Sequence, residues 1–350
     1  MAAAASNPVE LLAGLLQRFS PSGEEHSAVR YLTTQMHNLG FKAWEDEVGN
    51  AIGELGDGPN EIILLGHIDT VSGYINVHQE DDTLWGRGSV DAKGPLATFV
   101  SAAAQVGVRP GWKITVVGAV GEEDDGRGAR HIRAAHKPQY LVIGEPSQWN
   151  RVTLGYKGDA YFWYVVRRSV THTATQLESA CEAAVNFWNQ VAAHCAEFNT
   201  GKTRSFDLLM PSLRSLASSS DGFTETAQLT LGFRLPPGID VPDVEDILES
   251  YAGDGVVDLI RGEPAYRADK NNPLVRAFLA AIRRADGEPS FALKTGTSDM
   301  NTVAPIWACP TLAYGPGDSH LDHTAEEHIS ISEYLKSIQI LADVLTQLTR

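Results

Sequence analysis

The sequence predicts an α/β protein with a mixed sheet, interrupted by an inserted α+β unit. Continuous apolar runs at 62–65, 114–120 and 140–143 are typical of strands buried on both faces, and segments with helical spacing separate them. In the middle of the chain, alternating strands and amphipathic helices replace this pattern. At about 100 to 200 residues per domain, the 350 residues suffice for two units. We expect one unit at 1–155 and 267–350, and the second at 156–266.

Two helices open the first unit. Asn7 or Ser6 is placed to cap a helix that starts at Pro8. A second helix at 24–39 ends before Gly40, a residue type that favours helix termination. The elements expected next are strands at 41–45 and 61–65, a hairpin of 76–79 with 83–85, a helix at 94–105, a strand at 114–120, a short helix at 128–135 and a strand at 140–143.

The inserted segment follows a β-α-β-β-α-β-like order, which is typical of ferredoxin-like units. Residue ranges are assigned to five of these six elements: a strand at 160–165, a helix at 178–196, a strand at 227–235, a helix at 241–251 and a strand at 255–260. The first unit then resumes with a helix at 274–285, a loop at 294–301, a strand at 311–314 and a closing helix at 332–348.

The composition excludes several classes of protein. Lys and Arg number 28 against 44 Asp and Glu, and the net charge of −16 argues against binding to nucleic acid or anionic membranes. No stretch approaches the roughly 20 apolar residues of a membrane span. Cys181, Cys195 and Cys309 form no Cys-x-x-Cys pair, which argues against a disulfide framework and a thiolate zinc site. We therefore expect a soluble, cytoplasmic protein.

Polar residues follow each of the three buried strands. His67 and Asp69 close the first strand, and two residues apart on an extended backbone they point to the same face. A metal-bound imidazole usually has its second ring nitrogen held by a carboxylate or a carbonyl, and Asp69 or the local backbone is placed to do this. The alternative is a capped strand end with a satisfied histidine.

Three further carboxylates lie at comparable positions. Asp91 stands among glycines just before a helix, where it is either an N-cap or a ligand shared by two cations. Glu122 and Glu123 follow the second strand, either as solvated surface charge or as a pair in which one ligates a metal and the other takes a proton from metal-bound water. Glu145 follows the third strand, with an exposed glutamate as its alternative interpretation.

His323 follows a glycine-rich loop late in the chain and adds a second imidazole to the carboxylates, with an ordinary loop histidine as the alternative. Ligands of open α/β sheets gather beyond the carboxyl ends of the strands. Imidazole and carboxylate suit zinc or a similar divalent ion, and two ions that share a carboxylate lie roughly 3.5 Å apart. The residue pattern therefore predicts a divalent metal site.

These motifs together resemble the dinuclear zinc aminoacylase and carboxypeptidase G-like amidohydrolases, which include acetylornithine deacetylase and succinyl-diaminopimelate desuccinylase. The resemblance implies a zinc-peptidase-like catalytic domain, two zinc ions with cobalt as an alternative, and an inserted domain that serves as a lid and in homodimerisation. It implies that His67, Asp91 and Glu145 hold one ion and that Asp91, Glu123 and His323 hold the other. By the same resemblance, Asp69 orients His67 and Glu122 is the general acid/base.

A narrower resemblance is to the family of hydrolases that release lysine, and in some cases ornithine, from the γ-carboxyl of the C-terminal Glu of a LysW-like amino-group carrier protein. It is carried by the tracts 154–158, 294–301 and 314–319. It implies that His172, in His172-Thr173-Ala174, reaches the site of a dimer partner and stabilises the oxyanion there. It also implies that Arg234 lies near the substrate carboxylate, with a salt-bridged strand arginine as the alternative. The implied substrate-binding loop consists of Lys294, Thr295, Gly296, Thr297 and Ser298.

Other functions remain open from the sequence. A deacylase or desuccinylase of small molecules, such as acetylornithine, acetyl-lysine or succinyl-diaminopimelate, has the same metal site, and a binding module that has lost its chemistry keeps the same fold. A structural zinc site is disfavoured because no cysteine lies in any motif. An acidic carrier requires a basic surface on this acidic chain, and the candidates are Lys157, Arg167, Arg168, Lys202, Arg204 and Arg214, with ordinary surface scatter as the alternative.

Overall fold

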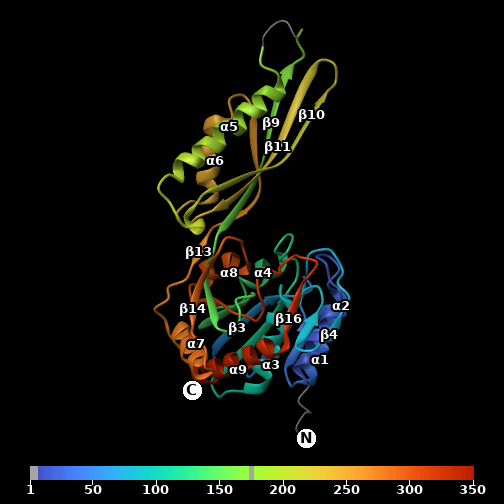
Figure 1. Ribbon diagram of the computed structural model, residues 1–350, viewed down its shortest axis with the longest axis vertical. Coiled ribbons are helices and arrows are strands. Elements are labelled where there is room, and N and C mark those ends of the chain that lie inside the picture. The colour runs from blue at the N-terminus through green and yellow to red at the C-terminus, as the bar shows by residue number, and fades with distance from the viewer. Residues whose placement is uncertain (1–6, 173–176) are drawn as a thin grey trace. The chain divides into compact units, whose positions relative to one another are not determined.

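The computed structural model describes residues 7–172 and 177–350, which form two compact units (Figure 1). Unit 1 comprises the chain up to Gly155 together with Ala268–Leu293 and Ser298–Arg350. Unit 2 comprises Tyr156–Arg267 and the short segment Lys294–Thr297. Two expectations fall outside the described residues: Ser6 as a helix cap, and Thr173 and Ala174 of the predicted motif around His172.

Unit 1 is built on a mixed sheet, as the sequence predicts. Its strands lie in the order β1 (Lys42–Glu45), β2 (Ala51–Leu55), β6 (Trp112–Ala119), β3 (Asn60–His67), β7 (Tyr140–Gly144), β15 (Thr311–Ala313) and β8 (Arg151–Tyr156), and β14 (Ser290–Lys294) also pairs with β8. The four central strands β6, β3, β7 and β15 are parallel, whereas β2 and β8 pair with them antiparallel. The central strands therefore all end at the same edge.

Both faces of this sheet are covered, because the middle of β3 is inaccessible on each side. Ile62 and Leu64 belong to the main core cluster, and Ile63 and Leu65 on the opposite face are equally buried. The covering helices are α1 (Pro8–Leu16), α2 (His26–Asn38), α3 (Lys93–Val106), α4 (Arg127–Ile132), α7 (Pro273–Arg284), α8 (Asp299–Trp307) and α9 (Ile331–Leu348). Burial on both faces explains why the sequence shows continuous apolar runs here instead of alternation.

A small three-stranded sheet in unit 1 joins two distant parts of the sequence. Its strands are ordered β16 (His328–Ser330), β5 (Thr83–Trp85) and β4 (His78–Glu80), and both pairings are antiparallel. Through it, the chain that leads to Asp91 lies beside the chain that follows His323.

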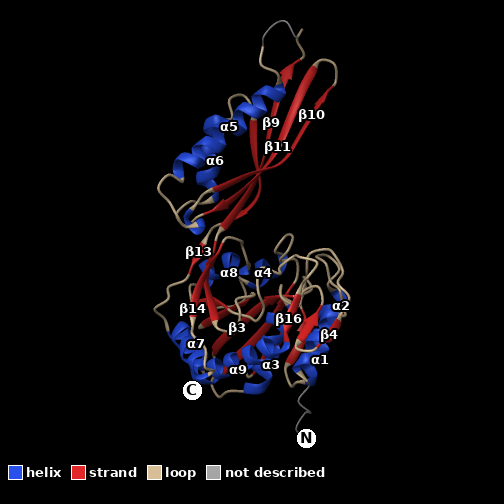
Figure 2. Cartoon of the chain, viewed as in Figure 1, coloured by secondary structure: helices blue, strands red, loops and turns tan. Residues whose placement is uncertain are grey.

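Unit 2 has the predicted β-α-β-β-α-β order, with β13 (Tyr266–Arg267) after it. Its elements are β9 (Gly158–Ser169), α5 (Ala180–Phe198), a short 3₁₀ helix η2 (Ser205–Asp207), β10 (Met210–Ser220), β11 (Thr224–Leu235), α6 (Val241–Tyr251) and β12 (Val256–Glu263). The antiparallel sheet has the order β10-β11-β9-β12, and α5 and α6 lie on one side of it (Figure 2). Alternate residues of β9, such as Phe162 and Tyr164, are therefore buried under the helices.

Several elements differ from the expected list. No residue range was expected for strands β2, β8, β10, β13, β14 and β16 or for the 3₁₀ helix η2. The expected loop at 294–301 is wrong from Asp299 onward, where α8 begins. Ser298 caps this helix and exchanges capping hydrogen bonds with Asn301. Among the described helices, none combines the length and the apolar character needed to cross a membrane. The three cysteines are free thiols.

Candidate metal centre

The parallel strands bring three polar tips to one edge of the unit 1 sheet. His67 is the last residue of β3, and Glu145 follows the last residue of β7 directly. Glu122 and Glu123 come three and four residues after β6 ends. Because β6, β3 and β7 are adjacent and parallel, these side chains gather beyond the same edge.

A first cluster of ligand atoms forms around His67. Its Nε2 lies 3.2 Å from Oδ1 of Asp91 and 4.0 Å from Oε1 of Glu145. One ligand atom from each of these three residues lies within 4.8 Å of the others. The His67 side chain is almost fully buried, so its ring cannot turn out toward water.

A second cluster uses the other oxygen of Asp91. Nε2 of His323 lies 3.1 Å from Asp91 Oδ2 and 3.0 Å from Oε1 of Glu123. The two carboxylate oxygens of Asp91 thus face two different imidazoles. Two three-residue sets of nitrogen and oxygen donors therefore share one carboxylate, and such donors suit divalent metal ions.

The alternative role of Asp91 as a helix cap does not hold. The N-cap of α3 is Ala92, and no side chain makes a capping hydrogen bond there. The Asp91 carboxylate is instead directed to the two histidines.

Asp69 contacts the His67 ring through its backbone, which is one of the two arrangements expected from the sequence. The hydrogen-bond partner of His67 Nδ1 is the Asp69 backbone carbonyl, at 3.0 Å, whereas the nearest carboxylate oxygen is 3.6 Å away. The carboxylate accepts the backbone N–H groups of Glu122 and Glu123, each at 3.1 Å, and the hydroxyl of Ser22 at 2.7 Å. Asp69 therefore holds the backbone of the paired glutamates as well as the ring. Ser22 was not predicted, because nothing in its local sequence marks it as a partner of Asp69.

Glu122 lies beside the first cluster. It forms a further group of close ligand atoms with His67 and Glu123. Burial raises the pKa of the Glu122 carboxyl well above its usual range, against the attraction of His67, and the negative charges of Glu145 and Asp299 raise it further. A carboxyl group with a raised pKa suits proton transfer near neutral pH.

The charges of the site are strongly interdependent. Burial opposes protonation of His67, but the adjacent carboxylates of Asp69 and Asp91 raise its pKa well above the usual range. Hydrogen bonds with Asp91 and Glu123 raise the pKa of His323 to about 10. The Asp91 pKa is lowered, because hydrogen bonds with both histidines outweigh the effect of burial. The carboxylates thus favour positive charge in this site, which bound metal ions would supply.

The predicted substrate-binding residues belong to unit 2, except for Ser298, which belongs to unit 1. Arg234 on β11 donates to the Thr297 hydroxyl at 3.1 Å, and both belong to unit 2. Lys294, at the end of β14, has its amine 6.0 Å from the centre of the Tyr156 ring. Thr295 and Gly296 form the turn that leads into α8, and buried Ser298 caps that helix. His172 is exposed, just after β9 in unit 2.

The six predicted surface cations do not form one patch. Lys157 is fully buried, and its amine donates to the carbonyls of Ser205 and Phe206 at 3.2 and 3.4 Å. Arg167 and Arg168 lie near the other end of β9, about 33 Å along the strand at 3.3 Å per residue. Arg168 is also ion-paired with acidic neighbours. Lys157 was wrongly included, because a lysine between strand residues shows no sign of burial in the sequence.

Comparison with protein families identifies the chain as a whole. Residues 63–347 match the model of peptidase family M20/M25/M40. The chain belongs to this family. Among solved structures, an M20 family metallo-carboxypeptidase from Sulfolobus solfataricus superposes with a TM-score of 0.78 at 16% identity, covering 98% of this chain and 99% of the other. At this identity the likeness concerns the fold, and it confirms the M20 architecture.

Curated relatives of this M20/M25/M40 member are considerably closer in sequence. The LysW-lysine hydrolase of Deinococcus radiodurans is 43% identical over 338 residues, which cover 94% of this chain and 93% of the relative. A putative LysW-lysine/LysW-ornithine hydrolase of Thermococcus kodakarensis is 40% identical over 341 residues, 97% of this chain and 92% of the relative. Family membership and the clustered His, Asp and Glu side chains indicate a hydrolase that holds a divalent metal ion.

Proposed function

We propose that this protein is a metal-dependent amide hydrolase that releases lysine, with ornithine as the alternative amino acid, from the γ-carboxyl of the C-terminal Glu of a LysW-like carrier protein. The observation that carries the proposal is the pair of ligand clusters that share Asp91, with Glu122 beside them. The substrate assignment is supported by the 43% and 40% identical relatives, which span nearly the whole chain.

In this proposal the site holds two zinc ions, with cobalt as an alternative. His67, Asp91 and Glu145 hold one ion, and Asp91, Glu123 and His323 hold the other. When bound, such ions lower the pKa of a coordinated water and polarise the amide carbonyl. A fully coordinated structural ion is disfavoured, because each cluster offers three protein donors and so leaves a position for water or substrate.

The chain's own residues then move the proton. Glu122 takes the proton from the attacking water and returns it to the leaving amine, a role that its place beside the ligand atoms of His67 and Glu123 supports. Asp69 keeps the Glu122 and Glu123 backbone in place through its two accepted hydrogen bonds. In a homodimer, His172 of one protomer serves as the oxyanion donor of the other, and Arg234 with the 294–298 loop binds the substrate carboxylate.

Paired substitutions at Glu122 and Glu123 test the division of labour. We expect Glu122→Gln to keep the metal content while turnover falls by about 10² to 10⁴-fold, because the proton acceptor is lost. Glu123→Gln should lose metal as well as turnover, because its oxygen belongs to the His323 cluster. Metal content and steady-state rates separate the two effects. Near-normal turnover of Glu122→Gln contradicts the assigned role.

The substrate class requires a direct comparison. We expect the zinc-loaded enzyme to hydrolyse carrier-linked lysine and carrier-linked ornithine much faster than free acetylornithine, and chelation to abolish all three reactions. A preference for acetylornithine would instead establish a small-molecule deacylase. Absence of turnover with full metal loading would indicate a binding module.

A further inference from the structure

The carboxylate of Glu327 is fully buried against the backbone that carries Asp91. Its Oε2 accepts a hydrogen bond from Nη1 of Arg87 at 2.8 Å and from the Gly88 N–H at 3.1 Å. Its Oε1 accepts the N–H groups of Val90 at 2.9 Å and of Asp91 at 3.1 Å. Each oxygen thus has two donors, and all four donors come from one short segment of the chain.

The same segment is tied to Glu327 through the backbone. The Gly86 N–H donates to the Glu327 carbonyl at 3.4 Å, and β16 pairs with β5 directly beside it. Asp91 therefore follows one strand of this pair, and His323 precedes the other by a few residues. Glu327 lies where the two segments that supply these ligands meet.

The two metal clusters depend on this junction unequally. His67 is buried at the end of a central strand, and its Nδ1 is held by the Asp69 carbonyl. His323 is on a loop, and about half of its side chain is exposed. His323 belongs to no strand of the large sheet, and β16, which follows it by a few residues, pairs with β5 on the chain that leads to Asp91.

We propose that Glu327 is a positioning residue for the metal centre. It sets the place of the Asp91 carboxylate relative to His323, and through it the affinity of the cluster formed by Asp91, Glu123 and His323. The inference rests on the proposed two-metal site, which it deepens by assigning control of the second ion to a residue that is not a ligand.

The test is a zinc titration of the whole protein against a competing chelator. We expect the unsubstituted protein to bind two Zn²⁺ per chain. In Glu327→Gln an amide N–H₂ replaces one of the two acceptor oxygens that face the four donors. We therefore expect the larger of the two dissociation constants to rise about 10- to 100-fold, while the smaller one changes little. Glu326→Gln is the matched control, because Glu326 is the adjacent residue and is exposed. Its two constants should not change.

The melting temperature of the metal-free protein distinguishes a purely structural role of Glu327 from a role in positioning the metal ligands. Glu327→Gln with a lowered melting temperature but unchanged zinc constants overturns the inference, while two-ion binding by the unsubstituted protein still supports the proposed function. Binding of fewer than two ions by the unsubstituted protein overturns both. If Glu327→Gln does not fold, Glu327→Asp takes its place, because it keeps the charge and withdraws the carboxylate by one methylene. Unchanged zinc constants in Glu327→Asp then count against the inference.

Discussion

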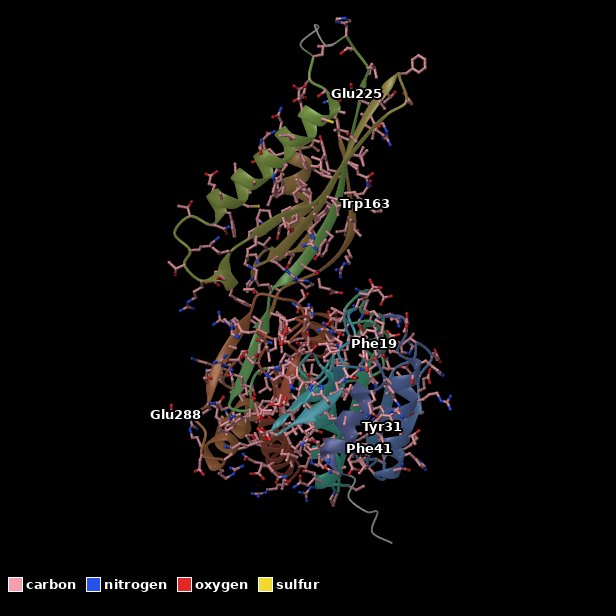
Figure 3. All side chains as sticks on the ribbon, turned by 45° about the vertical axis from the view of Figure 1, so that its right-hand side comes forward. Phe19, Tyr31, Phe41, Trp163, Glu225 and Glu288 are labelled. Atoms are coloured by element: carbon pink, nitrogen blue, oxygen red, sulfur yellow. The ribbon has the colours of Figure 1, made fainter. Side chains whose placement is uncertain are left out.

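The sheets of the two units bury apolar side chains in different ways. In unit 1 the central strands are parallel and inaccessible on both faces, so neighbouring residues such as Ile63 and Leu64 are both buried. In unit 2 the strands are antiparallel and the helices cover one face, so Phe162 is buried whereas Trp163 is 45% exposed. Figure 3 labels Trp163 on β9.

The difference explains where the candidate chemistry lies. Parallel neighbours end at one edge, so β3, β6 and β7 deliver side chains from three distant parts of the sequence to a single place. Antiparallel neighbours end at opposite edges, so β9 in unit 2 does not end at the same edge as its neighbours β11 and β12. Unit 2 instead presents a continuous sheet face.

The largest expected effect tests the two-sided burial of unit 1. We expect Ile63→Ala and Leu64→Ala each to lower the free energy of unfolding by about 2 to 5 kcal/mol, because each leaves a cavity in a closely packed interior. Denaturant unfolding measures both values. A negligible cost for either residue would mean that one face of β3 is open.

The next effect tests the strand tips. We expect Asp69→Asn to lower kcat/KM by about 10- to 100-fold, because an amide group cannot accept both backbone N–H groups of Glu122 and Glu123 as well as the Ser22 hydroxyl. Asp57→Asn, at an exposed position of the same unit, is the control. Equal rates for the two variants would remove Asp69 from the site.

A smaller effect concerns the opposite end of β3. Burial alone would raise the pKa of Glu61, but hydrogen bonds with His136, Lys113 and Thr115 lower it to about 2. Because this value lies below the ordinary pKa of 4.5, the group stabilises the fold above pH 4.5, and the contribution is lost as the pH falls toward 2.

We therefore expect Glu61→Gln to lower the free energy of unfolding by about 2 kcal/mol at pH 7. The difference from the unsubstituted protein should shrink as the pH is lowered from about 4.5 toward 2. Urea unfolding over this range measures it. A constant difference at every pH would show that packing, and not the charge, is responsible.

The smallest effect tests the open face of unit 2. We expect Trp163→Ala to cost about 1 kcal/mol, because much of the ring is already in water, whereas Phe162→Ala should cost about 3 to 5 kcal/mol. Unfolding experiments on both variants supply the comparison. A similar large cost at Trp163 would show that another surface covers this face.

The missed elements share a physical cause. Strand β10 is an exposed edge strand rich in serine, so it shows neither an apolar run nor a clear alternation. Strand β2 contains Gly53, where a Cβ would come within 2.5 Å of Met36 Sδ, so its residue choice reflects a helix packed close by. Such elements exist because of their neighbours, which local patterns do not record.

The sequence by itself determined the α/β class, the inserted unit and the strand ends at which His67, Glu122 and Glu145 stand, because buried strands require continuous apolar runs and end at polar residues. The tertiary structure alone decided which atoms meet. It directs the two oxygens of Asp91 to different imidazoles, turns the Asp69 carboxylate to the glutamate backbone and places Glu327 under the Asp91 segment. Some of these contacts join residues more than 230 positions apart, and only the packing of the strands brings them within hydrogen-bonding distance.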